Sequence, residues 1–352
     1  MKYENVCLAS VGYELPPNAV SSQELEDRLA PVYERLKLPH GRLELMSGIK
    51  ERRFWGNGTT PSSAAAMAGK KALDISGVPK EEIKVLFHAS VCRDFLEPAT
   101  ANVVHNALGL PADATVFDIS NACLGVLNGM ITLANMIELG QVRAGLIVSG
   151  EMGEALVDKT IETLNADESL TRKTIKPAFA SLTIGSAAVA VVMAHSDLMD
   201  GLAKEKHRLI GGVVQNATEH SALCKSDGDM GFSAGAQPLM DTDAELLLNA
   251  GCDLAEKTWA SFKKEIGWNE DGVNRVFTHQ VGIAHRRKLY EAIGVDIEKD
   301  FSTVEFLGNT GSAALPVTLG IGIEKGLLKS GDNVALLGIG SGLNSIMLGI
   351  EW

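Results

Sequence analysis

The stretch SNACLGVLNGM, residues 120–130, stands between two apolar segments of different character. The segment before it, Ala114–Ile119, is short and rich in apolar and β-branched residues, which predicts a buried strand. After it, apolar residues recur at helical spacing up to Gly140, as is typical of a buried helix that ends at a glycine. We therefore expect Cys123 in the first turn of a helix that directly follows a strand.

That position favours chemistry at the Cys123 thiol. The first turn of a helix has free backbone N–H groups and the positive end of the helix dipole, which lower the pKa of a thiol. The same N–H groups can bind a developing oxyanion. Cys123 is thus a candidate nucleophile. The alternative is that it is a small buried hydrophobe, as most free cysteines are.

The composition limits the class of protein. The chain has 352 residues, 45% of them hydrophobic, which suffices for one large or two ordinary domains with a sizeable core. No apolar run of about 18 residues occurs and the first residues do not open a signal peptide, so we expect a cytoplasmic protein without a membrane segment. Five scattered cysteines without a CxxC pair indicate reduced thiols, not disulfides or a zinc site. A net charge of −12 argues against nucleic acid as the main partner.

Strand and helix patterns alternate along the chain, which predicts an α/β architecture with parallel, buried sheets. A faint internal repeat accompanies them. The segment IELG at 137–140 is matched 186 residues later by IEKG at 323–326, and under this offset Cys123 falls on Asn309. We therefore expect two duplicated halves, 1–195 and 196–352. The alternative is that α/β units share a similar residue pattern without any duplication.

Three turns of the chain have the same form. Cys123, His279 and Asn309 each follow an apolar strand pattern and open an apolar helix pattern. Loops at the carboxyl ends of parallel strands are where α/β folds bind their ligands. A lone histidine at a helix start is more often structural, but a cysteine, a histidine and an asparagine at three matching turns indicate a site.

Taken together, these motifs resemble those of the thiolase superfamily, in its ketoacyl-synthase III branch. The similarity covers nearly the whole chain, including SGI at 47–49, HQ at 279–280, GNT at 308–310 and GIGSGLN at 338–344. Within that branch, RDFLEP at 93–98 and NACL at 121–124 are similar to the enzymes that join two long acyl chains head to head.

The resemblance implies a five-layered αβαβα thiolase fold and a homodimer. It also implies that Cys123 takes an acyl group from a thioester and that His279 and Asn309 donate hydrogen bonds to the second carbonyl as its enolate forms. The backbone N–H groups of Cys123 and Ser341 would form the acyl oxyanion hole. An acyl step needs a soft nucleophile and an enolate needs preorganised donors, so the chemistry agrees with these roles. No cofactor is implied beyond coenzyme A as the carrier of the substrate.

Glu97 decides the type of reaction. An ordinary acyl thioester has no CO₂ to lose, so a base must remove its α-proton, and the resemblance implies that the partner subunit supplies Glu97 for this task. Judged by the residues alone, Glu97 is more simply an exposed loop carboxylate before Pro98.

The chain departs from the family at one motif. Ala284 stands where carrier-protein-dependent synthases usually have an arginine. This disfavours an acyl carrier protein and favours coenzyme A thioesters, whose phosphates could meet Arg52, Arg53 or Arg287. The three arginines could equally be solvated surface charges.

The resulting hypothesis is an acyltransferase that makes a 2-alkyl-3-oxo acid or its thioester from two acyl-CoA molecules by Claisen condensation without decarboxylation. Three alternatives stay open. One is a decarboxylative ketoacyl synthase III that uses a malonyl thioester. Another is a synthase of the hydroxymethylglutaryl type, and the last is a non-catalytic homologue that only binds acyl groups or partners.

Overall fold

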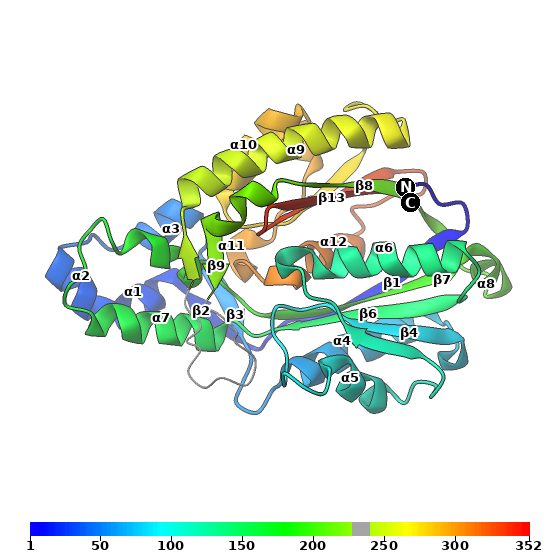
Figure 1. Cartoon of the computed structure of the whole chain (residues 1–352), viewed down its shortest axis with the longest axis horizontal. Helices are drawn as coiled ribbons and strands as arrows, with labels where there is room; N and C mark the ends of the chain where they lie inside the picture. Colours follow the sequence, from blue (N-terminus) through cyan, green and yellow to red (C-terminus); the bar gives the residue numbers. More distant parts are fainter. Residues whose placement is uncertain (227–239) are drawn as a thin grey trace.

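The computed structural model describes residues 1–226 and 240–352. Its elements are stacked in five layers, with helices outside both sheets and between them (Figure 1). The predicted αβαβα architecture is confirmed. From the bottom to the top of Figure 1, the helical layers are α4 (Pro61–Ser76) with α5 (Thr100–Leu108), then α6 (Gly125–Glu138) with α12 (Ala314–Glu324), then α9 (Ala244–Ile266) with α10 (Ile283–Ile293).

The two sheets are joined at one edge. The first has the strand order β5 (Thr115–Asp118), β4 (Ile83–His88), β6 (Ala144–Glu151), β7 (Ala187–His195), β1 (Val6–Glu14). The second has the order β11 (Arg275–Thr278), β12 (Asn333–Gly340), β13 (Asn344–Glu351), β8 (His207–Asn216). Strands β1 and β8 pair only through Cys7 with Arg208 and Leu8 with His207.

The sheets are mixed, whereas the sequence predicted parallel ones. Strands β5, β4 and β6 are parallel, as are β11 and β12, but β7 and β13 run antiparallel to their neighbours. Only three residues, 341–343, join β12 to β13. So short a connection can form a hairpin but not a parallel crossover, which needs a dozen residues or more.

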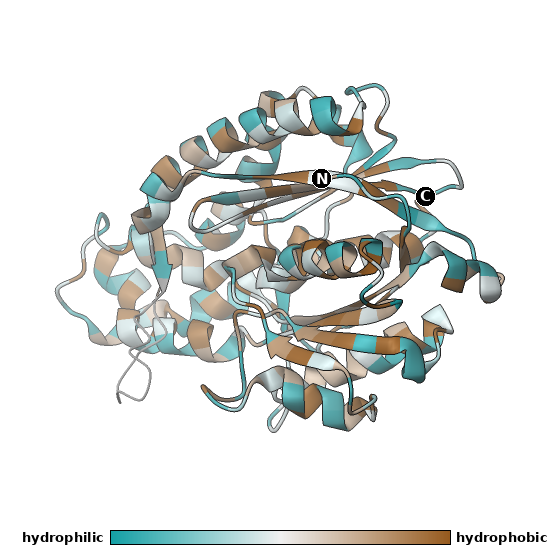
Figure 2. Ribbon diagram, turned by 45° about the vertical axis from the view of Figure 1, so that its right-hand side comes forward, coloured by the Kyte–Doolittle hydropathy of each residue, from teal (hydrophilic) through white to brown (hydrophobic). Residues whose placement is uncertain are grey.

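Apolar clusters fill the spaces between the layers. One contains α6, α12 and the inner faces of both sheets, a second packs α4 and α5 on the first sheet, and a third packs α9 and α10 on the second. Figure 2 shows hydrophobic residues along the strands and the central helices. The outer helix α4 lies close to the first sheet, since a Cβ on Gly150 of β6 would come within 2.2 Å of the backbone oxygen of Pro61 in α4. This close packing explains why α4 is rich in small residues.

The two central helices begin in the same way. A short 3₁₀ turn, η2 (Ala122–Leu124), precedes α6, and another, η6 (Gly311–Ala313), precedes α12. Each is therefore a sharp entry into a helix buried between two sheets. The division of the chain into residues 1–195 and 196–352 stays a prediction.

Some local expectations need correction. Strand β5 was expected to be buried, but it is an edge strand with Phe117 41% exposed, because its only partner in the described sheet is β4. Glu51–Phe54 forms strand β3, which pairs with β2 (Asn18–Ser21). Ser21 and Glu24 form a capping box at the start of α1 (Ser22–Arg28).

Two long excursions of the chain from the nine-stranded sheet contain regular elements. Residues 153–180 hold α7 (Glu154–Ala166) and most of η3 (Lys176–Thr183), which pack with α1, α2 (Ala30–Leu36) and α3 (Arg42–Ser47) around an apolar cluster of their own. The second excursion holds η4 (Thr218–Leu223), β9 (Cys224–Ser226) and the start of β10 (Met240–Thr242), and residues 227–239 lie outside the described part. Within residues 1–226 and 240–352, no helix is both long and apolar enough to cross a membrane.

Candidate active site

One cavity brings the three predicted turns together. Cys123, His279 and Asn309 all line it, and so does Ser341, the residue directly after β12. Its remaining wall is largely apolar and comes from η3, β9, β10, α9 and α10. Segments that lie far apart in the sequence therefore place a thiol, an imidazole and a carboxamide around one volume.

Cys123 is held in a strained and well-supported turn. Ala122, directly before it, has a φ of 43°, a left-handed conformation that a residue with a Cβ rarely adopts. Behind the turn, the Val126 N–H donates to Ser312 Oγ at 2.9 Å, which ties the start of α6 to η6. Asn344 Nδ2 donates to Asn121 Oδ1 at 3.2 Å and to the Ser341 oxygen at 3.0 Å. The closing motif of the chain thus fixes the cysteine turn.

The expected low pKa of the Cys123 thiol is not found. Burial, with smaller contributions from the nearby Glu151 carboxyl and Cys224 thiol, raises this pKa to about 12, although a backbone hydrogen bond opposes the rise. Desolvation of the thiolate outweighs the effect of the helix start, because the sulfur is enclosed. The Cys123 side chain is therefore a thiol at neutral pH in this chain.

His279 follows β11 and is a neutral imidazole. Burial, with a smaller contribution from His285, lowers its pKa to about 4. Its Nδ1 atom is buried and has no hydrogen-bond partner in the described residues. The next residue, Gln280, donates to the Phe301 oxygen at 2.9 Å and accepts from the N–H groups of Thr303 and Val304 at 2.8 Å. Gln280 thus fixes the start of α11 (Val304–Leu307), which leads to Asn309.

The orientation of Asn309 is set by hydrogen bonds on its backbone and its side chain. Its N–H donates to the Thr183 oxygen and its carbonyl accepts from the Gly185 N–H, both at 2.9 Å. Its side-chain oxygen accepts from the Gly311 N–H at 3.0 Å. Because that contact occupies the acceptor end of the carboxamide, the donor end is the one that can serve a ligand oxygen.

Glu97 does not line the cavity of its own chain. It is exposed, in the loop between β4 and α5, next to Phe95 and Leu96, which are 54% and 45% exposed. The structure therefore brings Cys123, His279, Asn309 and Ser341 together but leaves Glu97 outside. Its predicted place in a partner's site stays a prediction.

The three arginines predicted to meet coenzyme A differ in their surroundings. Arg52 is 1% exposed and donates to Ser22 Oγ and to the Leu182 oxygen, and burial lowers its pKa to about 10. This places Arg52 in the core, because residues alternate between the two faces of β3, and argues against contact with a phosphate. Arg53 donates to the Pro16 oxygen and is half-buried, whereas Arg287 is exposed on α10.

Two polar features near the site were not predicted. Glu151, at the end of β6, is a carboxyl group beside Cys123 that is only 3% exposed. Its signal in the sequence is a carboxylate that ends an otherwise apolar strand, AGLIVSGE. Arg286 lines the cavity and forms an ion pair with the buried Asp300 at 2.5 Å. Its position next to Arg287 is the one signal for it in the sequence.

Comparison with known proteins places the chain in a family. A thiolase N-terminal domain model matches residues 55–209, and a model of the C-terminal part of 3-oxoacyl-[acyl-carrier-protein] synthase III matches residues 264–352. The acyl-CoA:acyl-CoA alkyltransferase of Shewanella oneidensis is 42% identical over 353 residues, and that of Xanthomonas campestris is 36% identical over 352 residues. In both cases, all of this chain and all of the relative are covered.

Solved structures agree with these relatives. Cerulenin-bound OleA of Xanthomonas campestris has a TM-score of 0.93 and 36% identity, covering 100% of this chain and 98% of that one. OleA variants in which a cysteine, a glutamate or a histidine is replaced have TM-scores of 0.92 to 0.93. This chain therefore belongs to the acyl-CoA:acyl-CoA alkyltransferase family, the OleA-type condensing enzymes of the thiolase superfamily.

Proposed function

We propose that this chain joins two acyl-CoA thioesters head to head, without loss of CO₂, to give a 2-alkyl-3-oxo acid or its thioester. The observation that carries the proposal is the cavity in which Cys123, His279 and Asn309 meet, in a chain 42% identical to an acyl-CoA:acyl-CoA alkyltransferase. The wall formed by α9, β9 and β10 is mostly apolar and suits an alkyl chain.

The first half-reaction loads the enzyme. Cys123 Sγ attacks the carbonyl carbon of one acyl-CoA, and the bond from that carbon to the coenzyme A sulfur breaks. The thiol proton leaves on coenzyme A, so the products are acyl-Cys123 and free coenzyme A. The backbone N–H groups of Cys123 and Ser341 stabilise the oxyanion of the tetrahedral intermediate.

The second half-reaction forms the carbon–carbon bond. A base removes the α-proton of the second acyl-CoA, and the enolate oxygen accepts hydrogen bonds from His279 and Asn309. A neutral imidazole is a suitable donor here, and the lowered pKa of His279 keeps it neutral at pH 7. The enolate carbon attacks acyl-Cys123 and expels its sulfur. Attack by water on the remaining thioester then gives the acid and the second coenzyme A.

We assign the base to Glu97 of a second copy in a homodimer. In support, Glu97 is exposed and lies in a region with exposed apolar side chains, namely Val91, Phe95, Leu96 and Phe117. A surface of this kind is typical of a protein interface.

The proposal also includes a cytoplasmic, lipid-forming role, with coenzyme A as carrier and no further cofactor. We propose that Arg53 and Arg287 contact the phosphates of coenzyme A, whereas the buried Arg52 does not.

Incubation with a single acyl-CoA tests the function directly. We expect mass spectrometry to detect a 2-alkyl-3-oxo product from acyl-CoA alone, with two molecules of coenzyme A released for each acid formed. The C-terminal match to 3-oxoacyl-[acyl-carrier-protein] synthase III favours one other candidate, a decarboxylative synthase. Product formation that requires malonyl-CoA and releases CO₂ would establish that candidate instead.

A further inference from the structure

Glu151 is a buried carboxyl group that has no role in the reaction proposed above. It ends strand β6 and accepts hydrogen bonds from three backbone N–H groups: Val91 at 3.0 Å, Cys92 at 3.2 Å and Ser312 at 3.0 Å. Burial raises the pKa of this carboxyl, and the three donors oppose the rise. A carboxylate is the side chain that can satisfy three donors with two oxygens.

The donors come from two segments that the proposed reaction uses. Val91 and Cys92 open the loop that carries Glu97. Ser312 belongs to η6, directly after Asn309. The η6 turn lies against the carboxylate, since a Cβ built on Gly311 would be 3.0 Å from Glu151 Oε1. Glu151 therefore bridges the Glu97 loop and the Asn309 turn.

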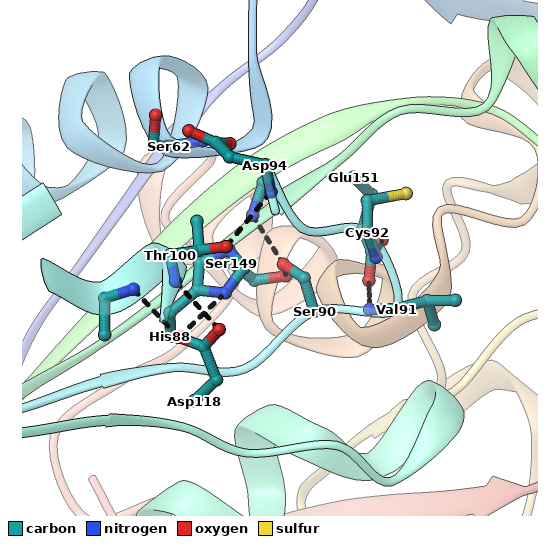
Figure 3. Close-up of polar contacts among 12 residues, drawn as sticks. Ser62, His88, Ser90, Val91, Cys92, Asp94, Thr100, Asp118, Ser149 and Glu151 are labelled. Atoms are coloured by element: carbon teal, nitrogen blue, oxygen red, sulfur yellow. Dashed lines mark hydrogen bonds and ion pairs between the residues drawn. The ribbon is translucent and has the colours of Figure 1, made fainter. Parts of the chain in front are cut away.

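Other polar contacts fix the base of the Glu97 loop (Figure 3). Ser90 and Ser149 are joined through their hydroxyls at 2.9 Å, and Asp94 Oδ1 accepts from the Ser62 N–H at 2.9 Å. The Asp94 N–H in turn donates to Thr100 Oγ1 at 3.1 Å. Figure 3 shows Ser90, Val91 and Cys92 following each other after the end of β4, with Glu151 beside Cys92. The loop is thus anchored at both ends, whereas Glu97 between them is exposed.

We propose that Glu151 is a positioning residue for the condensation step, holding the Glu97 loop and the Asn309 turn in fixed places relative to Cys123. The inference rests on the proposed function, because Glu97 and Asn309 act in its second half-reaction. In the homodimer, Glu151 positions Asn309 for the site of its own chain and Glu97 for the site of the partner.

Glu151→Gln is the sharpest test. Glutamine keeps the size of the side chain but has one acceptor oxygen, so its NH₂ group faces one of the three N–H donors. The loop or the turn must then move, and a misplacement of about 1 Å can cost about 100-fold in rate. We expect a 10- to 100-fold slower condensation, on that principle, with acyl loading of Cys123 no slower than in wild type, because the change removes a carboxyl group that raises the pKa of this thiol.

Single-turnover assays on the full chain measure the two steps separately. Intact-protein mass reports loading of Cys123, and product mass reports condensation. Glu154→Gln, an exposed residue three positions further on, is the matched control and should leave both steps unchanged. Glu151→Asp keeps the carboxylate but is one methylene shorter, so it cannot reach all three donors and should also slow condensation selectively. This second variant keeps the test valid if Glu151→Gln fails to fold.

Two results would overturn the inference. One is condensation by Glu151→Gln or Glu151→Asp at the wild-type rate. The other is a parallel loss of loading, condensation and melting temperature, which indicates a purely structural residue. Glu97→Gln separates this failure from failure of the proposed function. If Glu97→Gln cannot condense but Glu151→Gln can, only the inference is wrong. If Glu97→Gln condenses normally, the assignment of the base is wrong, whatever Glu151→Gln does.

Discussion

The side-chain oxygen of Asn309 accepts a hydrogen bond from the backbone N–H of Gly311, at 3.0 Å. Gly311 has a φ of 57°, and this left-handed conformation lets the turn fold back on the asparagine at little steric cost. The contact settles which end of the carboxamide is available to the cavity. It leaves the donor end to a carbonyl or enolate oxygen, in keeping with the proposed role.

Replacement of Asn309 by aspartate should therefore abolish condensation and leave the fold intact. An aspartate oxygen can still accept from Gly311, but the other oxygen repels an enolate. Asn309→Ala is the milder comparison, and loss of one such donor costs about 100- to 1,000-fold in rate. Product formation in a single turnover measures both variants. Normal condensation by Asn309→Asp would remove Asn309 from the second half-reaction.

Cys123 should be the acyl acceptor among the three cysteines that line the cavity. The intact mass of the protein should rise by one acyl group with acyl-CoA, and Cys123→Ala should abolish this adduct. Cys224→Ser and Cys252→Ser are matched controls, because both side chains line the same cavity. Each of these two variants should still acquire one acyl group on Cys123. Peptide mapping that finds the acyl group on Cys224 or Cys252 would contradict the assignment.

Glu97 should act across the proposed dimer. Cys123→Ala and Glu97→Ala subunits should each be inactive alone. Mixed dimers should recover condensation, because one of their two sites then has Cys123 from one chain and Glu97 from the other. Native mass spectrometry must first demonstrate subunit exchange. Exchange without recovery would place Glu97 in the site of its own chain or outside it.

His279 should make stability depend on pH. Its pKa is about 4 in the folded chain, below the ordinary value near 6.5, so the unfolded chain binds a proton more readily. The contribution of neutral His279 to stability is complete above about pH 6.5 and is lost as the pH falls towards 4. His279→Asn should therefore lose less free energy of unfolding between pH 7 and pH 4 than wild type, in urea titrations. An equal loss in both proteins would contradict the lowered pKa.

Local sequence predicts those parts of the site whose defining residues lie close together in the chain. The cysteine turn was predicted because a short β-branched segment, a small-residue turn and a helical repeat follow each other within 27 residues, 114–140. His279 follows strand β11 as the same pattern predicts, whereas Asn309 was expected to follow a strand and instead follows the short helix α11. Their meeting in one cavity required the stacking of both sheets on α6 and α12, which local pattern does not determine.

Other features depend on partners that lie far away in the sequence. The donors to the Glu151 carboxylate are 59 to 161 residues distant, so no local motif marks this contact. The thiol pKa of Cys123 was predicted in the wrong direction, because the helix start is a local feature and the degree of enclosure is not. Arg52 was expected to be a phosphate contact or a surface charge, and only the pairing of β3 with β2 shows that its side chain points into the core.

The burial of α6 and α12 has a consequence for how this enzyme could change in evolution. Nine of the 11 residues of α12 are buried, and α6 is packed between the same two sheets. The turns that carry Cys123 and Asn309 are attached to these helices, so a substitution that shifts either turn must also disturb both sheets. The wall residues of α9, at positions 247–252, precede the part of the helix that packs on the second sheet, and β9 and β10 form a separate two-stranded sheet. Divergence in preferred acyl chain length should therefore accumulate in that wall, while the reacting centre stays the same.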